Sequence, residues 1–310
     1  MNSKICGGEA IVNPQTPTAS PLEFQGVAES EGRSKSAIFG RDAVSYENPR
    51  IPANYVLRNI SPFSRETKCR TKLAPVYNVA NRWEIGVDEA GRGPMFGPLY
   101  VAGVILPKAE NFRHNDMKDS KKFHSQTKIK EVAEYIKTHA LAWHIQSISK
   151  EVVDEINIRQ AVLRGMHECC RQCIRQITES YPDTTTATDI CLLIDGNDFV
   201  PLRMYDAENE TMIEIPYVSV EGGDNTYTAI AAASILAKVA RDEYIAELCR
   251  QYPKLDQHYH IGKNKGYGTK QHLDGIREYG ITQWHRTTFG LCKTAPLCVL
   301  VRDDVSTENL

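Results

Sequence analysis

Acidic side chains stand at the ends of three apolar stretches of the chain. Asp88 and Glu89 close the stretch "EIGVDE", Asp195 closes "ICLLID", and Asp224 follows the next apolar stretch within "VEGGD". In α/β sheets, binding sites form beyond the strand ends, and carboxylates clustered there repel one another unless a cation holds them. Carboxylate oxygens suit Mg²⁺ or Mn²⁺, and neighbouring carboxylates can hold two such ions about 3.5 to 4 Å apart. We therefore expect a divalent-metal site, although any one of these acids alone would also suit a solvated strand end.

A glycine-rich triplet follows the first acid pair at once. Gly91 and Gly93 lack a Cβ, so their backbone can approach a ligand closely. Arg92 between them has a planar fork that can hold a phosphate or orient the loop. Alone, the triplet would also suit an ordinary turn with a surface arginine. Next to two acids, it predicts a loop that brings the substrate up to the metal site.

The elements that must position these residues follow from the periodicity of the apolar residues. We expect strands over 84–89, 98–106, 141–148, 190–195 and 214–220, with the first two joined by the glycine turn. Ser125 can cap a helix whose apolar residues share one face, namely Ile129, Val132, Ala133 and Ile136. Longer helices are expected over 158–179 and over the alanine-rich segment 227–249. This order predicts a mixed α/β sheet with helices on its faces.

Composition narrows the class of protein. The chain has 310 residues, of which 41% are hydrophobic, enough for a sizeable core. Residues 1–80 lack sustained periodicity, and we expect a mostly disordered extension there. The longest apolar stretch, 99–106, is far shorter than the roughly 20 residues that cross a bilayer, so neither a membrane nor a secreted location is expected. The net charge of −2 hides basic stretches over 58–72 and 254–293.

The cysteines and histidines do not form a pattern of metal ligands. Nine cysteines in a chain of this length favour a reducing compartment over a disulfide framework. Cys169, Cys170 and Cys173 suit ordinary helix positions, with a zinc or redox site as the less favoured alternative. His258 and His260 alternate as a metal pair would, but no further ligand stands near them, which favours a polar loop.

Six motifs in order resemble the type 2 ribonuclease H family, and within it the single-chain ribonuclease HII branch. They are "VDEAGRGPMFGPLYVAGVIL", "DSKK", "LLIDGN", "GGD", "AAASILAKVARD" and "KGYGT", and the resemblance covers residues 83–293. It implies a ribonuclease H-like fold, with a mixed five-stranded sheet flanked by helices and a C-terminal helical part. It also implies an endonuclease that hydrolyses the RNA strand of RNA–DNA hybrids and incises duplex DNA at a single embedded ribonucleotide. Hydrolysis assisted by two metal ions would leave 3′-hydroxyl and 5′-phosphate ends.

The resemblance assigns roles to individual positions. The metal-binding acids of the family match Asp88, Glu89, Asp195 and Asp224, so two Mg²⁺ or Mn²⁺ ions are expected during catalysis. Substrate binding is expected from Gly91, Arg92, Gly93, Tyr267, Lys121 and Lys265. The glycine loop and the tyrosine would sense the ribose 2′-hydroxyl. Apart from the resemblance, further candidates for phosphate contacts, each of which would also suit an ordinary solvated surface position, are Lys122, Lys238, Lys263 and Arg286. Asn264 stands directly before "KGYGT", where many members have a histidine, and this departure leaves the role of that loop open.

Other acids near the motifs receive lesser roles. Asp242 lies about five turns along the alanine-rich helix from Asp224, too far to share one metal shell, so we interpret it as a salt-bridged position and leave a supporting role open. Asp198 is interpreted as a loop acid and Asp119 as a turn cap.

The expected catalytic domain spans 81–295, followed by a tail over 296–310. We expect a monomer that acts on RNA–DNA hybrids and ribonucleotide-containing duplex DNA. Clamp binding is not expected, because "QWHRTTF" lacks paired aromatic residues. A cytoplasmic location is favoured, and a nuclear or organellar one stays open. Two other classes stay open: a scaffold that binds nucleic acid without catalysis, and a metal nuclease of the same broad fold that does not require a ribose.

Overall fold

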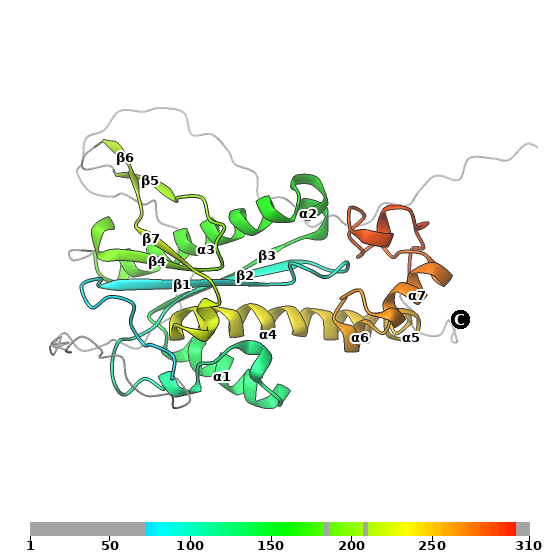
Figure 1. Ribbon diagram of the computed structural model, residues 1–310, viewed down its shortest axis with the longest axis horizontal. Helices are drawn as coiled ribbons and strands as arrows, with labels where there is room; N and C mark the ends of the chain where they lie inside the picture. Colours follow the sequence, from blue (N-terminus) through cyan, green and yellow to red (C-terminus); the bar gives the residue numbers. More distant parts are fainter. Residues whose placement is uncertain (1–71, 183–185, 207–209, 302–310) are drawn as a thin grey trace, which may run out of the picture. The chain divides into compact units, whose positions relative to one another are not determined.

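A mixed sheet of five strands lies at the centre of the computed structural model, which describes residues 72–182, 186–206 and 210–301. Its strands are β1 (Trp83–Ala90), β2 (Leu99–Ile105), β3 (Ala142–Ile148), β4 (Ile190–Asp195) and β7 (Tyr217–Val220). Their order in space is β3-β2-β1-β4-β7 (Figure 1). β1 is antiparallel to β2 and parallel to β4, and β4 is parallel to β7. The C-terminal ends of β1, β4 and β7 therefore meet at one edge, and the predicted fold class is confirmed.

Helices cover both faces of the sheet. α4 (Thr228–Gln251) and α1 (Gln126–His139) lie on one face, and α3 (Ile158–Ser180) lies on the other, preceded by α2 (Lys150–Ile156) (Figure 1). The predicted cap of α1 is confirmed, because the Ser125 side chain accepts a hydrogen bond from the backbone N of Lys128 at 3.2 Å. The apolar face predicted for α1 is buried. Each helix layer thus buries its own apolar cluster against the sheet.

α4 lies unusually close to β1 because small residues face each other. Gly86 of β1 lies directly under the start of α4, where a Cβ on Gly86 would come within 2.1 Å of the carbonyl carbon of Ala229. Four of the alanines that follow in α4 are fully buried, namely Ala231, Ala232, Ala233 and Ala237. This contact fixes the first turn of α4 over the strand that carries the acid pair.

One predicted strand is divided in the structure. The segment 214–220 was expected to be continuous, but Glu214 ends β6 (Thr211–Glu214) and β7 begins at Tyr217. Pro216 lies between them and has no N–H to donate to a strand ladder. β6 pairs with β5 (Arg203–Asp206) in a separate antiparallel hairpin, which the sequence analysis did not predict.

The C-terminal helices surround an apolar cluster of their own. They are α5 (Lys254–Tyr259), α6 (Ile261–Asn264) and α7 (Lys270–Tyr279). Phe96, from the loop between β1 and β2, is fully buried in this cluster together with Tyr259 and Ile276. The loop after the acid pair is therefore anchored in the C-terminal helical part.

The described segment before β1 contacts the start of α4. Ala74 N donates to Thr226 O at 2.8 Å, and Thr228 N, at the start of α4, donates to Ala74 O at 3.0 Å. Residues 1–71 and 302–310, where most of the predicted extension and tail fall, lie outside the described residues, so the domain boundaries stay predictions.

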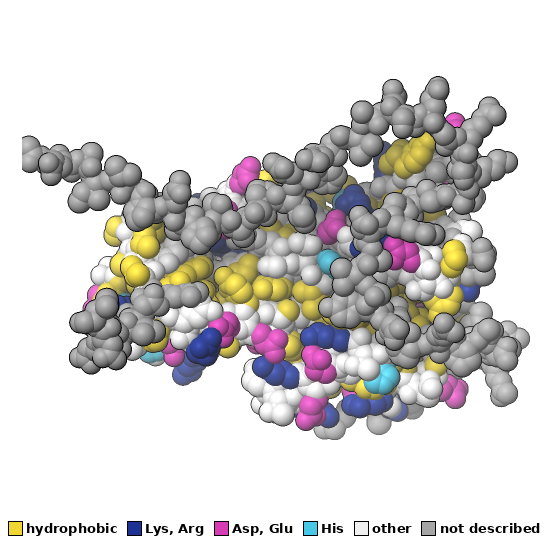
Figure 2. Space-filling model, turned by 180° about the vertical axis from the view of Figure 1, so that it is seen from behind, with side chains coloured by type: hydrophobic (Ala, Val, Ile, Leu, Met, Phe, Trp, Pro, Cys, Tyr) yellow, Lys and Arg dark blue, Asp and Glu magenta, His cyan; other side chains and the backbone are white. Residues whose placement is uncertain are grey.

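Within the described residues, no helix is both long enough and apolar enough to pass through a membrane. Basic and acidic side chains intermingle along the lower edge of the view in Figure 2. Ion pairs such as Lys130 with Glu243, whose Nζ and Oε1 lie 2.9 Å apart, join α1 to α4. The helix layer thus carries mixed charge.

Candidate active site

The parallel strands bring the four predicted acids to one end of the sheet. Asp88 and Glu89 are among the last residues of β1, and Asp195 is the last residue of β4. Val87 pairs with Ile194, so the residues that follow them, Asp88 and Asp195, lie side by side on neighbouring strands. Asp224 lies in the short turn η4 (Gly223–Asn225) that follows β7.

Hydrogen bonds fix the orientation of the three aspartates. Asp88 Oδ1 accepts from the backbone N of Glu89 at 2.7 Å, and Asp195 Oδ1 accepts from the backbone N of Gly223 at 2.7 Å. The second bond ties the end of β4 to η4, where a Cβ on Gly223 would come within 2.5 Å of Ile230 Cδ1 and 3.2 Å of Asp195 Oδ1. Asp224 Oδ1 accepts from the side-chain amide of Asn225 at 2.9 Å.

Burial and mutual repulsion raise the pKa values of these acids. The pKa of Asp88 lies well above its usual range because the group is buried and because Glu89 and Asp195 are negatively charged. Burial also raises the pKa of Glu89, against the opposing effect of Arg92. The pKa of Asp224 is raised by burial and by the charges of Asp119 and Asp195. The end of the sheet therefore carries poorly compensated negative charge.

The donor chemistry of this cluster fits a hard divalent cation. All four side chains offer carboxylate oxygens, the ligands of Mg²⁺ and Mn²⁺. Among the residues that the structure describes, no three acidic, histidine or cysteine side chains already surround a common point in the way metal ligands do. Because like charges repel, we expect these carboxylates to turn toward one point only when a cation is bound there.

The loop after the acids is held by two buried arginines. Arg286 donates from Nη2 to Gly91 O at 2.7 Å and from Nη1 to Arg92 O at 3.3 Å. Arg241 donates to Phe96 O and to Lys265 O, both at 2.9 Å. These bonds force the carbonyl groups of the loop inward. Gly91 has a φ of +97°, and a Cβ there would lie 2.3 Å from Arg241 Nε.

The prediction that Arg286 contacts a phosphate is wrong. Its side chain is fully buried, and burial together with the charge of Arg241 lowers its pKa to about 10. The structural role of both arginines was not predicted from the sequence. No local signal would have identified it, because their burial depends on the loop folding back from a distant part of the chain.

Arg92 and Tyr267 present their side chains at the surface of the site. Arg92 Nη1 lies 3.5 Å from Glu89 Oε1, and the Arg92 side chain is 49% exposed. Tyr267 is 51% exposed, and a Cβ on Gly93 would lie 3.4 Å from Tyr267 Cε1. The structure thus brings the predicted tyrosine beside the predicted glycine loop.

The motif "DSKK" lies against η4. Asp119 Oδ1 accepts from the backbone N of Lys121 at 2.9 Å, which confirms the predicted turn cap. Asp119 Oδ2 also accepts from the Asn225 side chain at 3.3 Å, and Lys122 Nζ donates to Asn225 Oδ1. Asn225 therefore joins this motif to Asp224, a role that the sequence analysis missed. Lys121 is exposed nearby.

Two other acids near the motifs form ion pairs with basic side chains. Lys238 Nζ and Asp242 Oδ2 lie 2.7 Å apart, and the predicted salt bridge is confirmed. Asp198, as a loop acid, forms an ion pair with Arg159 at 2.7 Å.

The cysteines and histidines with alternative metal roles have other surroundings. Cys169, Cys170 and Cys173 are free thiols buried in α3. The ring of His258 stacks on Tyr279 with centroids 4.0 Å apart, and His260 links α5 to α6.

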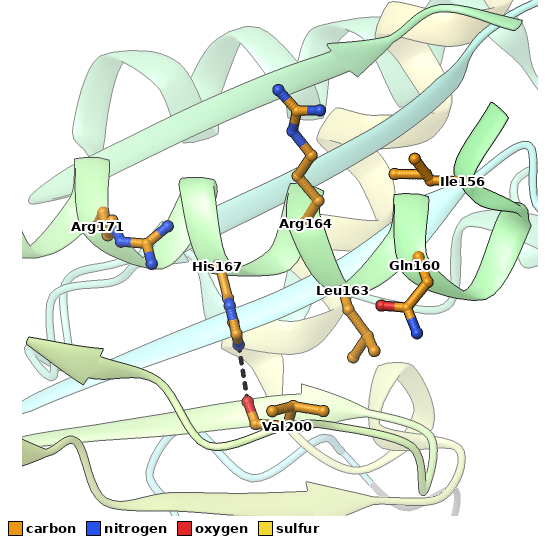
Figure 3. Close-up of a pocket in the computed structure, with 7 residues that line it drawn as sticks. All are labelled: Ile156, Gln160, Leu163, Arg164, His167, Arg171 and Val200. Carbon is orange, nitrogen blue, oxygen red and sulfur yellow. Dashed lines mark hydrogen bonds between the residues drawn. The ribbon is translucent and has the colours of Figure 1, made fainter. Parts of the chain in front are cut away.

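A surface hollow of about 500 Å³ lies over α3, apart from the acids. Figure 3 shows His167 reaching from α3 toward Val200, whose carbonyl accepts a hydrogen bond from His167 Nε2 at 2.7 Å. Its lining holds no acid, being made of Ile156, Gln160, Leu163, Arg164, His167, Arg171 and Val200. The candidate site therefore rests on the acids at the end of the sheet.

Known proteins share the sequence of the region that carries this site. A family model for ribonuclease HII matches residues 85–292, which include the four acids, the triplet 91–93 and Tyr267. The chain belongs to the ribonuclease HII family. A ribonuclease HII from Parabacteroides distasonis is 41% identical over 215 residues, which make up 69% of this chain and 94% of the relative. One from Oceanobacillus iheyensis is 39% identical over 222 residues, or 72% of this chain and 74% of the relative.

A solved structure agrees with the fold. The ribonuclease H2 of Pyrococcus horikoshii OT3 superposes with a TM-score of 0.51 at 20% identity, covering 68% of this chain and 95% of that one. As a member of the ribonuclease HII family, the chain is an endonuclease that cleaves RNA in RNA–DNA hybrids and at ribonucleotides embedded in DNA. The predicted family and activity are confirmed, and membership implies the use of a divalent metal ion.

Proposed function

We propose that Asp88, Glu89, Asp195 and Asp224 hold two Mg²⁺ or Mn²⁺ ions and form the catalytic centre. The observation that supports this most is that β1, β4 and the turn after β7 bring the four acids to one end of the sheet. When bound, such ions make a bound water a stronger nucleophile at neutral pH and stabilise the charge on the leaving oxygen. The products would carry 3′-hydroxyl and 5′-phosphate ends.

The side chains around the acids would orient the substrate. The backbone of Gly93 is exposed for close approach to a sugar, with Tyr267 beside it, and the buried Gly91 would act by shaping the loop. A ribose 2′-hydroxyl both donates and accepts hydrogen bonds, so backbone groups and a phenol can distinguish it from deoxyribose. Arg92 is half exposed next to Glu89 and would orient a phosphate toward the acids.

Lysines on both sides of the site would contact the phosphate backbone. Lys121 is close enough to Asp224 to lower its pKa, and it is exposed on the turn η2 (Ser120–Lys122). Lys265 lies between α6 and Tyr267, with its carbonyl held by Arg241. Such contacts are independent of base sequence and weaken with salt.

We infer that the partner is nucleic acid and that the catalytic part, residues 81–295, acts as a monomer inside the cell without a sliding clamp. A gel filtration experiment with light scattering tests the oligomeric state, and a dimer in the presence of substrate would contradict it.

Three strand-labelled duplexes test the activity directly. The full chain is incubated with Mg²⁺ or Mn²⁺ and an RNA–DNA hybrid, a DNA duplex with one ribonucleotide, or an all-DNA duplex. We expect cleavage of the first two, with a 5′-phosphate on the downstream product, and none of the third. Cleavage of all-DNA would favour a nuclease that needs no ribose, and binding without cleavage would favour a scaffold.

A further inference from the structure

Two buried histidines meet between the glycine loop and Tyr267. His272, in the first turn of α7, and His285, in the turn 282–286, are both fully buried, and their Nε2 atoms lie 3.0 Å apart. Two imidazole nitrogens at this distance share one proton, so one ring donates and the other accepts. Neither histidine belongs to the proposed metal site or to the proposed phosphate contacts.

The outer partners of the two rings assign the protons. The backbone N of Thr282 lies 2.8 Å from His285 Nδ1 and can only donate, so His285 carries its proton on Nε2. The carbonyl oxygen of Tyr267 lies 2.9 Å from His272 Nδ1 and can only accept, so His272 carries its proton on Nδ1. The bonds therefore run in one direction, from Thr282 through both rings to the backbone of Tyr267.

The arrangement requires both rings to be neutral. An extra proton on His272 would set its Nε2–H against that of His285 across 3.0 Å, and one on His285 would set its Nδ1–H against the backbone N–H of Thr282 across 2.8 Å. Burial lowers the pKa of His272, and burial together with the proximity of His272 lowers the pKa of His285 to about 3. The pair thus stays neutral throughout the range in which the enzyme would work.

The same pair is connected to the loop after the acids. Phe96 and His285 form an antiparallel bridge, and their ring centroids lie 5.0 Å apart in an edge-to-face contact. Met95 accepts from Arg286 N at 2.8 Å and donates from its own N to Gly266 O at 2.9 Å. The segment that carries His285 therefore contacts both the glycine loop and the turn of Tyr267.

We propose that His272 and His285 are positioning residues that set the placement of Tyr267 relative to Gly91–Gly93, and thereby the preference for ribose over deoxyribose. This inference rests on the proposed role of that loop and of Tyr267 in recognising the ribose 2′-hydroxyl. Neither imidazole touches the substrate. They act through the Tyr267 carbonyl and the Phe96 backbone. A displacement of the Tyr267 ring by a fraction of an ångström would change the space left for the sugar.

Binding measured in EDTA tests the selectivity without cleavage. The ratio of the dissociation constants for an all-DNA duplex and a duplex with one ribonucleotide gives the ribose preference. His285→Phe fills the volume without hydrogen bonds, and we expect it to lower this ratio about tenfold while leaving all-DNA binding unchanged. His285→Gln keeps a donor toward His272 and should retain the ratio within about threefold. His139→Phe, on the exposed end of α1, is the matched control.

The outcomes separate the inference from the function on which it rests. A folded His285→Phe variant with the wild-type ratio would overturn the inference, as would equal weakening of both duplexes, which is the mark of a merely structural role. A wild-type protein without ribose preference would instead refute the role of Tyr267 in recognising the ribose itself.

A spectroscopic measurement tests the protonation of the two histidines directly, without any variant having to be active. In the full chain labelled with ¹⁵N-histidine, long-range proton–nitrogen correlations report which nitrogen of each ring is protonated. We expect the Nδ1–H form for His272 and the Nε2–H form for His285 at neutral pH. The opposite tautomer in either ring, or a cationic ring, would overturn the proposal.

Discussion

At the scale of single residues, Asp195 couples the acids at the end of the sheet. Its negative charge contributes to the raised pKa values of Asp88, Glu89 and Asp224. Its own carboxylate is oriented by the backbone N of Gly223. A bound cation would replace these repulsions by attractions. Removal of the Asp195 charge should therefore impair metal binding while leaving the shape of the site nearly unchanged.

The variant Asp195→Asn tests this role. The amide keeps the size of the side chain and an oxygen acceptor for Gly223, but it loses the charge. We expect single-turnover cleavage to fall by at least about 10³-fold, while hybrid binding changes little. Asp198→Asn, in the same loop but paired with Arg159, should cleave normally. Normal cleavage by Asp195→Asn would refute its place among the metal ligands.

The sequence predicts the acids better than their supports. Asp88 and Asp195 are predictable because an apolar strand and the acid at its end are local features. Arg241, Arg286 and Asn225 are not, because each acts on backbone or side-chain atoms far away in the chain. Their importance arises only when the segments pack together.

At the scale of elements, two close contacts hold the site. α4 rests on β1 through Gly86. α2 is joined to the segment after Arg286, where Asp154 accepts hydrogen bonds from the backbone N and hydroxyl groups of Thr287 and Thr288 at 2.6 to 3.0 Å. The first contact positions the acids, and the second positions the arginine that holds the glycine loop.

Gly86→Ala tests the contact between β1 and α4. Because a Cβ would lie 2.1 Å from backbone atoms of Ala229, the helix must move away. We expect the free energy of unfolding to fall by about 2 kcal/mol, measured by urea denaturation. Gly268→Ala meets only the flexible end of Met95 at 3.3 Å and should cost much less. Equal stability of the two variants would contradict the close packing.

The pH dependence of stability tests the contact made by Asp154. Burial alone would raise the pKa of Asp154, but the bonds from Thr288 and Thr287 outweigh it and lower the pKa. The folded pKa thus lies below the unfolded value of about 3.9, so the stabilisation is complete above that value and is lost as the pH falls through the folded pKa.

We therefore expect Asp154→Asn to lower the Tm at pH 7, with a difference from wild type that shrinks below about pH 4. The adjacent exposed variant Glu155→Gln is the control. A difference in Tm that is independent of pH would show that charge plays no part in this contact.

At the scale of the whole molecule, the chain is slightly acidic and yet binds a polyanion. Its net charge is −2 and its pI about 6.5. Long-range attraction from net charge therefore contributes little, and affinity must come from the few cations placed beside the site. The fold class was predictable because strand order and helix spacing are regular. The break at Pro216 and the β5–β6 hairpin were not, because short exposed strands leave a weak pattern.

Salt dependence tests the local cations. Lys121→Gln and Lys265→Gln should each reduce the slope of log K against log salt by about one, because each removes one phosphate contact. Lys128→Gln changes a lysine of α1 that is paired with Glu131 at 3.1 Å, and it should leave the slope unchanged. An unchanged slope in the first two variants would show that the phosphate backbone of the substrate does not contact these lysines.

The central claim is that the four carboxylates form a divalent-metal site, and a titration of the full chain with Mn²⁺ followed by electron paramagnetic resonance tests it most directly. We predict saturable loss of the free-ion signal for the wild type and binding at least about tenfold weaker for Asp88→Asn and Asp195→Asn. Identical titration curves for the wild type and both variants would contradict the account.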